Sequence, residues 1–165
     1  MTVSQFCTDK EITDLYNRHV DMVYRISLML LKNIADAEDA TQTTFIKLIA
    51  SNTLFSNEEH EKRWLIFVTK NICKDMLKSA WHSKRSDWEH TIKQPCPDMN
   101  DTDKEDIWRK VTDLDEKYKL PLYLYYYEGY RTEEIATMFN INHATVRTRL
   151  RTARKKLKLQ MEDDK

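Results

Sequence analysis

Apolar residues recur along the first half of the chain with the spacing of α-helices. Between Asp9 and Ala80 they form three stripes in succession, the second starting near Ala35 and the third following a break at Ser51–Asn57. Positions spaced by three and four residues fall on one face of a helix, so three long amphipathic helices are predicted. The stripes consist of Ile12, Leu15, Tyr16, His19, Val23, Ile26 and Leu30, then Ala37, Ala40, Phe45 and Leu48, then Trp64, Leu65, Phe67, Val68, Ile72, Met76 and Leu77.

The helical pattern stops at residues 81–103, a mostly polar stretch with Pro95 and Pro97. It resumes at residue 104 and continues to about residue 160. We therefore expect an all-α fold with one domain at residues 9–80, a linker at 81–103 and a second domain at 104–160. One Gly and three Pro in 165 residues agree with a helical protein. Pro121 lacks a backbone N–H, so we expect a helix to break there and a new helical turn to start at this proline.

The last forty residues have the pattern of a helix-turn-helix. Ile135, Ala136 and Phe139 share one helical face, and Asn140 follows where the chain has to reverse. Asn tolerates the left-handed backbone that such a reversal requires. Asn142 is a good N-cap for the next helix, because its side-chain oxygen accepts hydrogen bonds from unpaired backbone N–H groups. The apolar stripe of that helix is Val146, Leu150, Ala153 and Leu157.

The other faces of this second helix are basic and point to DNA. In a helix-turn-helix, outward side chains enter the major groove, where Arg pairs with guanine and nearby cations neutralise phosphates. A basic helix end also complements the helix dipole and can be only a solvated face. No carboxylate interrupts the cations from His143 to Gln160, which favours DNA contact. The candidate contacts are His143, Arg147, Thr148, Arg151, Thr152, Arg154 and Lys155.

Charge is segregated along a chain whose net formal charge is zero. Between Lys62 and Arg85, seven cations accompany only one carboxylate, whereas Asp36–Asp39 and Asp98–Asp106 are acidic. Two basic segments separated by acidic ones suggest two nucleic-acid contacts and at least one partner that is not nucleic acid.

Other signals are weak. The three cysteines are far apart, so neither a disulfide framework nor a metal site is supported, and a reduced cytoplasmic location is expected. The spacing of His82, His90 and Cys96 is too irregular for a metal site, and no cofactor is implied.

No apolar stretch is long enough to cross a bilayer, and the N-terminus does not resemble a signal peptide. Without a glycine-rich phosphate loop or a catalytic triad spacing, the chain is not expected to be an enzyme.

Several of these segments, in this order, resemble extracytoplasmic-function sigma factors of bacterial RNA polymerase. The resemblance lies in Asp36–Gln42 followed by Phe45, then Trp64–Leu65 and Asn71, then Tyr125–Tyr130 leading into the helix-turn-helix. It covers nearly the whole chain and implies a sigma region 2 helical bundle and a sigma region 4 helix-turn-helix. The expected function is binding of core RNA polymerase and promoter recognition in transcription initiation. The alternative is a helix-turn-helix regulator that acts without polymerase.

The resemblance also implies roles for individual residues. Asp36, Asp39 and Gln42 match the helix that docks on the largest polymerase subunit, although acidic residues at a helix start also favour the helix dipole. The loop from Phe55 to Glu61 matches the part that takes a base of the minus-ten element out of the stack. The minus-ten candidates on the next helix are Lys70, Asn71, Lys74 and Lys78. The helix-turn-helix would read the minus-thirty-five element.

The expected partners are therefore core RNA polymerase, promoter DNA and an anti-sigma factor, with no membrane insertion. The helix near Tyr123–Tyr130 resembles the one that packs near the polymerase flap, although Tyr125–Tyr127 are more often packing residues. Trp81 and Trp88 could stack on nucleic acid or on an inhibitor, or fold back on the first domain. Asn57 replaces a frequent Gly of the family, and three glutamates crowd the same loop, which puts an inherited base preference there in question.

Overall fold

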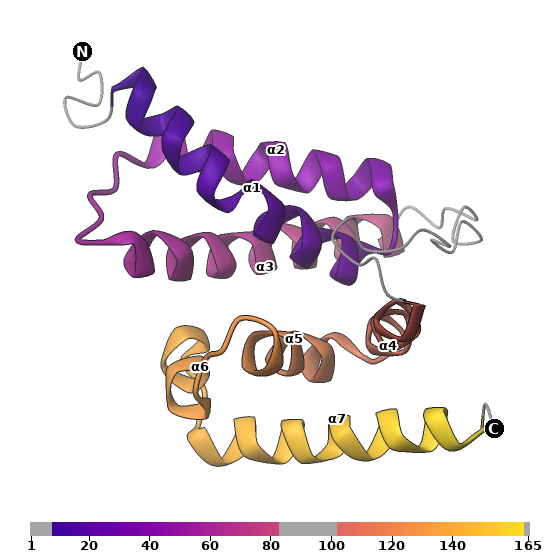
Figure 1. Ribbon diagram of the computed structural model, residues 1–165. Coiled ribbons are helices and arrows are strands. Elements are labelled where there is room, and N and C mark those ends of the chain that lie inside the picture. Colours follow the sequence, from indigo (N-terminus) through magenta and orange to yellow (C-terminus); the bar gives the residue numbers. More distant parts are fainter. Residues whose placement is uncertain (1–7, 83–101, 164–165) are drawn as a thin grey trace. The chain divides into compact units, whose positions relative to one another are not determined.

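The computed structural model describes residues 8–82 and 102–163, with side chains for residues 8–79 and 106–158. Every regular element in these ranges is a helix, as the sequence predicts. The helices belong to two units, the first ending at Ile92 and the second beginning at Lys93. Figure 1 labels the helices of both units. Trp88, His90 and Cys96 lie outside the described residues, and Trp81 and His82 lie in a helix whose side chains there are not described.

The first unit contains three helices that all contact one another. They are α1 (Asp9–Leu31), α2 (Ile34–Ser51) and α3 (Glu58–His82). The break predicted at Ser51–Asn57 separates α2 from α3, but α3 begins six residues before Trp64, where the third apolar stripe starts. Residues 58–61, expected in a loop, are thus the first turn of α3.

Local side chains fix where the helices of the first unit begin. Thr8 and Glu11 form a capping box at α1, in which Thr8 Oγ1 accepts from the Glu11 N–H and Glu11 Oε2 accepts from the Thr8 N–H. Lys32 then adopts a left-handed φ of 56° and ends α1. Asn33 Oδ1 accepts from the Asp36 N–H and starts α2. These caps satisfy backbone groups that a helix end leaves unpaired, and the caps that end α1 and start α2 are the adjacent residues Lys32 and Asn33.

The core of this unit is apolar with two buried hydroxyls. Val23, Ile26 and Leu65 are fully buried among the three helices. Thr44 on α2 and Thr69 on α3 are also fully buried, with their Oγ1 atoms 3.5 Å apart. Each hydroxyl donates to the carbonyl four residues earlier in its own helix, so both buried donors have an acceptor.

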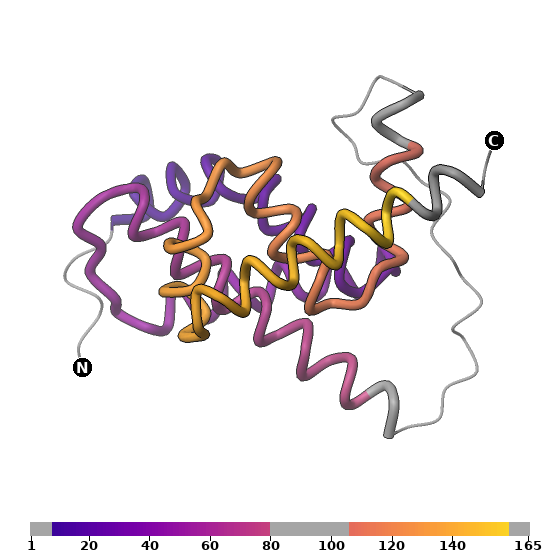
Figure 2. Tube along the Cα trace, turned by 90° about the horizontal axis from the view of Figure 1, so that it is seen from below, coloured from indigo at the N-terminus to yellow at the C-terminus, as the bar shows by residue number. Residues whose placement is uncertain are grey.

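The second unit contains α4 (Thr102–Thr112), α5 (Glu116–Tyr126), α6 (Thr132–Phe139) and α7 (His143–Asp163). The long helix α7 contacts the other three. Figure 2 follows the chain from α6 through a short turn into α7, in orange to yellow. Gly129 has a φ of 76°, a left-handed value that glycine adopts without strain, and it lies in the connection from α5 to α6.

The break expected at Pro121 is absent, and this expectation was wrong. Pro121 lies inside α5, which continues without interruption from Glu116 to Tyr126. The proline removes one backbone hydrogen bond, but buried side chains flank it on both sides within the helix. Burial of Leu120, Leu122 and Leu124 offsets the lost bond and keeps the helix in one piece.

Candidate nucleic-acid and partner interfaces

The turn between α6 and α7 has the geometry that the sequence predicts. Asn140 adopts a left-handed φ of 52° and ψ of 49°. The Ile141 N–H donates to the Ala136 carbonyl, and Asn142 Oδ1 accepts from the Ala144 N–H at 2.9 Å. The first bond closes α6 and the second starts α7, so two asparagines set the angle between the helices.

The buried face of α7 leaves a basic face outward. Val146, Leu150 and Ala153 are at most 1% exposed. The candidate contacts on the other faces are Arg147, Thr148, Arg151 and Lys155, all exposed, and Thr152, which is half-buried. The spacing of Arg147, Arg151 and Lys155 by four residues places them along one side of the helix, where an outward basic row can follow a groove of DNA.

Two other predicted contacts of α7 are engaged within the protein. His143 Nε2 lies 2.6 Å from Thr132 Oγ1 and 3.7 Å from the carboxylate of Glu133, both on α6. Arg154 Nε donates to Tyr126 Oη, and its guanidinium also lies over the ring of Tyr125. Both side chains therefore tie α7 to its neighbours in addition to any contact with DNA.

An acidic residue borders this surface. The Glu133 backbone N–H lowers the pKa of its carboxyl, slight desolvation opposes this effect, and His143 and Arg131 add to the lowering. Glu133 is thus charged at neutral pH beside the start of α7. A negative group there repels phosphate and limits how DNA can approach the α6 side of the helix.

The minus-ten candidates share a face of α3. Asn71, Lys74 and Lys78 are exposed and Lys70 is half-buried, whereas Ile72 and Cys73 on the opposite side are buried.

An aromatic residue, Phe67, lies on this basic face and was not predicted as a contact. Phe67 was assigned to the apolar stripe of α3, but its side chain is 42% exposed. It precedes Lys70, Asn71 and Lys74 by three, four and seven residues, which places it on their side of the helix. An exposed aromatic ring among cations is suited to stacking on unpaired bases. The sequence did contain a signal for this exposure. Phe67 is spaced by three and four residues from Lys70 and Asn71, and polar residues at this spacing indicate a solvent-exposed side of a helix.

The connection before α3 is held by aromatic and polar contacts. Phe55 packs edge-on against His60 and Trp64, with ring centroids 5.1 and 5.8 Å apart. The Ser56 N–H donates to His60 Nδ1, and the His60 N–H donates to Asn57 Oδ1. Leu54, in this connection, is 62% exposed. A loop held in this way presents its exposed residues in a defined conformation.

The glutamates that crowd this region have partners in the protein. Both carboxylate oxygens of Glu61 accept a hydrogen bond from Nη2 of Arg18 on α1, and Glu61 Oε2 lies 3.1 Å from Nε2 of the buried His19. The hydrogen bond with Glu61 raises the pKa of Arg18, and slight burial opposes the shift. Glu59 pairs with Arg63 within α3. Much of the acidic charge expected to face DNA is thus directed to structural ion pairs.

The proposed docking helix carries its predicted polar residues on the surface. Asp36, Asp39 and Gln42 are all exposed on α2. Ile46 and Ile49 are 63% and 50% exposed, four and seven residues beyond Gln42. These two isoleucines were not predicted as part of the site, and they extend the acidic face into an apolar one. Such a combined surface fits a protein partner better than DNA.

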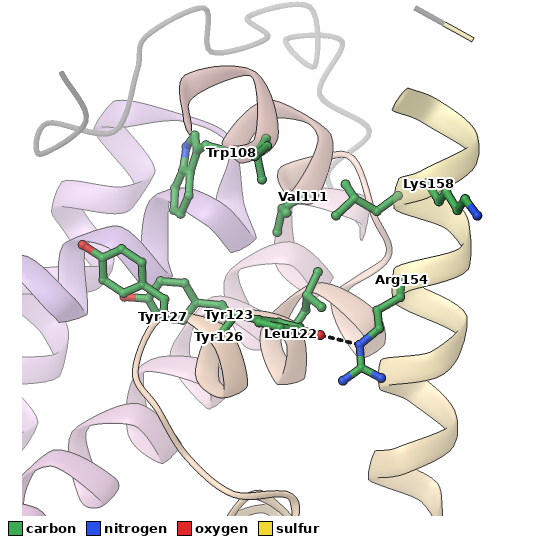
Figure 3. Close-up of a pocket in the computed structure, with 10 residues that line it drawn as sticks. Trp108, Val111, Leu122, Tyr123, Tyr126, Tyr127, Arg154 and Lys158 are labelled. Atoms are coloured by element: carbon green, nitrogen blue, oxygen red, sulfur yellow. Dashed lines mark hydrogen bonds between the residues drawn. The ribbon is translucent and has the colours of Figure 1, made fainter. Parts of the chain in front are cut away.

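A second apolar surface lies in the C-terminal unit (Figure 3). A pocket of about 500 Å³ opens between α4, α5 and α7. Its lining includes Ile107, Trp108, Val111, Leu122 and Tyr123 on the apolar side. Tyr126 and Tyr127, expected to be packing residues, border it with 59% and 45% of their surface exposed. This is the kind of groove that takes an apolar helix or loop of a partner.

Within the residues that the structure describes, none of the helices has the length and apolar character needed to cross a membrane.

Comparison with known proteins gives matches over both units. The family model described as "Sigma-70 region 2" matches residues 15–83, and the family model described as "Sigma-70, region 4" matches residues 104–157. The chain is 28% identical to the ECF RNA polymerase sigma factor SigL of Mycobacterium tuberculosis over 155 residues, which cover 90% of this chain and 88% of SigL. It is 28% identical to the RNA polymerase sigma factor SigV of Bacillus subtilis, covering 87% of this chain and 86% of SigV.

A solved structure has the same fold. It is the sigma factor RpoE of Bartonella quintana in complex with the anti-sigma factor NepR, with a TM-score of 0.75 and 21% identity. The alignment covers 94% of this chain and 99% of that one. The two family regions, in the order region 2 then region 4, account for most of the sequence. The chain therefore belongs to the sigma-70 family, as a sigma factor of the extracytoplasmic-function type.

Proposed function

We propose that this protein binds core RNA polymerase and directs it to promoters by contacting two DNA elements. The observation that carries the proposal is the presence of two separate basic helix faces, on α3 and on α7, in a chain that matches sigma regions 2 and 4. The proteins it resembles are named RNA polymerase sigma factors. In this role the chain contributes binding and positioning in the cytoplasm and performs no catalytic step.

The division of labour follows the chemistry of each face. On α7, Arg147 and Arg151 would read bases of a duplex minus-thirty-five element, because Arg pairs bidentately with guanine in the major groove. On α3, Lys70, Lys74 and Lys78 would follow phosphates of the minus-ten element, with Asn71 next to the bases. Phe67 would stack on a base of the opened strand, which helps to recover the few kcal/mol that unstacking costs.

The remaining surfaces would serve protein partners. The face of α2 with Asp36, Asp39 and Gln42 would dock on the largest polymerase subunit, where charge complementarity guides association. The apolar pocket beside α5 would receive the polymerase flap. An anti-sigma factor would hold the protein inactive by covering these same surfaces. Neither DNA face needs to bind tightly alone, because tethering on polymerase raises the effective concentration of the second contact.

Run-off transcription with purified core polymerase tests this function. We expect the chain to produce promoter-dependent transcripts from a diverse promoter library, and to bind the same duplexes weakly without core polymerase. Substitution of Arg147 or Arg151 by Ala should relax selection at the upstream element by about 1–3 kcal/mol for the contacted base. Specific operator binding without polymerase, together with no transcript in its presence, would instead identify a regulator of the ordinary helix-turn-helix kind.

A further inference from the structure

A second hollow of the C-terminal unit lies beside the DNA-reading face of α7. It has a volume of about 400 Å³ and lies between the first turn of α5 and the first half of α7. Lys117 and Tyr118 line it from α5, and Thr148, Arg149 and Thr152 line it from α7. None of the residues that line it is acidic. The hollow is distinct from the apolar pocket, which has no lining residue in common with it.

Two lysines lie near the ring of Tyr118, which lines the hollow. Lys117 Nζ lies 4.9 Å from the centroid of Tyr118, and Lys156 Nζ lies 5.6 Å from the same centroid. Among the side chains that the structure describes, neither Lys117 nor Arg149 has a carboxylate within ion-pair distance. Lys117 and Arg149 thus line one hollow without a carboxylate between them, so their charges repel, and an anion placed between them removes that repulsion.

The position of the hollow decides which anion it would meet. Thr148 and Thr152 line the hollow and also belong to the outward face of α7. His143, which contacts α6, marks the other flank of the helix. The major groove is about 12 Å wide and an α-helix with side chains is about 10–12 Å across, so both flanks of an inserted helix lie against phosphates. The flank with Lys117 and Arg149 carries positive charge, whereas the other flank carries Glu133.

We propose that this hollow binds a backbone phosphate of the duplex that α7 reads, with Lys117 and Arg149 as the phosphate-binding cations. This makes α5 a second DNA-contacting helix, in addition to its part in the helix-turn-helix scaffold. The inference rests on the proposed function and adds to it residues outside the predicted recognition surface. A phosphate contact carries no sequence information, so its effect is to fix the register and orientation of α7 on the duplex.

The test is the salt dependence of promoter binding by the holoenzyme. Core polymerase with the full chain is titrated against a fluorescent promoter duplex at several KCl concentrations. Each phosphate contact contributes about 0.9 to the slope of log K against log salt, so Lys117→Gln and Arg149→Gln should each lower the slope by about 1. The affinity deficit of each variant should shrink by about threefold between roughly 50 and 200 mM salt. The loss of affinity caused by each substitution should be the same on a promoter with the preferred minus-thirty-five sequence and on one in which that sequence is altered.

Two controls separate the outcomes. Arg109→Gln removes an exposed cation of the same unit on α4 and should leave the slope unchanged. Arg151→Gln should change selectivity between upstream elements. The inference is overturned if Lys117→Gln and Arg149→Gln match Arg109→Gln in slope while the wild type binds its promoter specifically. Failure of the wild-type holoenzyme to select any promoter would reject the proposed function itself. Lys117 is exposed, so its variant is expected to fold even if that of the half-buried Arg149 does not.

Discussion

Arg154 on α7 donates a hydrogen bond from Nε to the hydroxyl of Tyr126 on α5, and its guanidinium lies 5.4 Å from the centroid of the same ring. The guanidinium is also 5.6 Å from the centroid of Tyr125. One cation thus joins the long recognition helix to the helix that lines the apolar pocket. Since the pocket is bordered by both Tyr126 and Arg154, this pair joins α5 and α7 at the edge of the pocket (Figure 3).

Replacing Tyr126 by Phe should loosen the packing of α5 on α7. The variant keeps the ring and removes the hydroxyl acceptor, and the bond is exposed, so we expect a loss of about 0.5–1 kcal/mol. Hydrogen exchange measured by mass spectrometry should show faster exchange in peptides from α5 and α7. Tyr125→Phe is the matched control, because it removes a neighbouring hydroxyl and leaves the bond to Arg154 in place. Equal exchange in the two variants would contradict a stabilising role for the Arg154–Tyr126 bond.

Arg154 and its neighbour Lys155 should differ in their effects on DNA binding. Both were predicted as DNA contacts, but Arg154 is held against two tyrosines, whereas Lys155 is exposed with no such contact. We expect Lys155→Gln to lower the salt-dependence slope of holoenzyme binding by about 1, as loss of a phosphate contact does. Arg154→Gln should lower it less and destabilise the unit more. A larger slope change for Arg154→Gln would show that its guanidinium leaves the tyrosines to bind phosphate.

The sequence predicted the helix-turn-helix well because each of its parts has a local cause. Asn140 and Asn142 act through their own backbone and through the next turn, and the stripe of Val146, Leu150 and Ala153 is read directly from spacing. The same local reasoning failed at Pro121. There the outcome depends on how much apolar surface the rest of the fold buries on either side of the proline, and spacing within one helix does not contain that information.

The spacing of apolar residues also failed to predict how exposed some side chains are. Phe67 and Tyr16 fit apolar stripes by spacing, yet they are 42% and 44% exposed, because the stripe is wider than the surface its neighbours cover. Ile46 and Ile49 were not singled out although they are exposed on α2. The ion pairs of Glu61 join residues more than forty positions apart and could not be predicted from spacing.

Phe67 should affect promoter opening through its aromatic ring. Base stacking on an aromatic side chain contributes about 1–3 kcal/mol per base, so Phe67→Leu should reduce open-complex formation while leaving the apolar contact with the helix. Phe67→Tyr should restore it, because the stacking surface returns. Open complexes can be measured by permanganate reactivity of unpaired thymines on a promoter that the protein uses. Full activity of Phe67→Leu would assign Phe67 a role other than stacking.

Loss of the Glu61 carboxylate should destabilise the first unit. Glu61→Gln weakens two hydrogen bonds from Arg18 and a contact with the buried His19. Because Arg18 is partly exposed, solvent screening limits the expected cost to about 1–2 kcal/mol, measured by urea unfolding. Glu59→Gln is the control, since its i,i+4 pair with Arg63 contributes only about 0.2–0.5 kcal/mol. Equal effects of the two substitutions would mean that the contact between α1 and α3 contributes little.

Asp39 and Glu38 are neighbouring exposed carboxylates of α2, but the proposed docking face includes only Asp39. Asp39→Lys should slow association with core polymerase several-fold at low salt, because charge complementarity acts mainly on the encounter rate. The difference should diminish as salt shortens the range of the interaction. Glu38→Lys makes the same charge change one position away, on another side of the helix, and should have a smaller effect. Association rates can be measured by stopped-flow fluorescence with labelled chain, and equal slowing by both variants would mean that net charge, and not a docking face, governs the encounter.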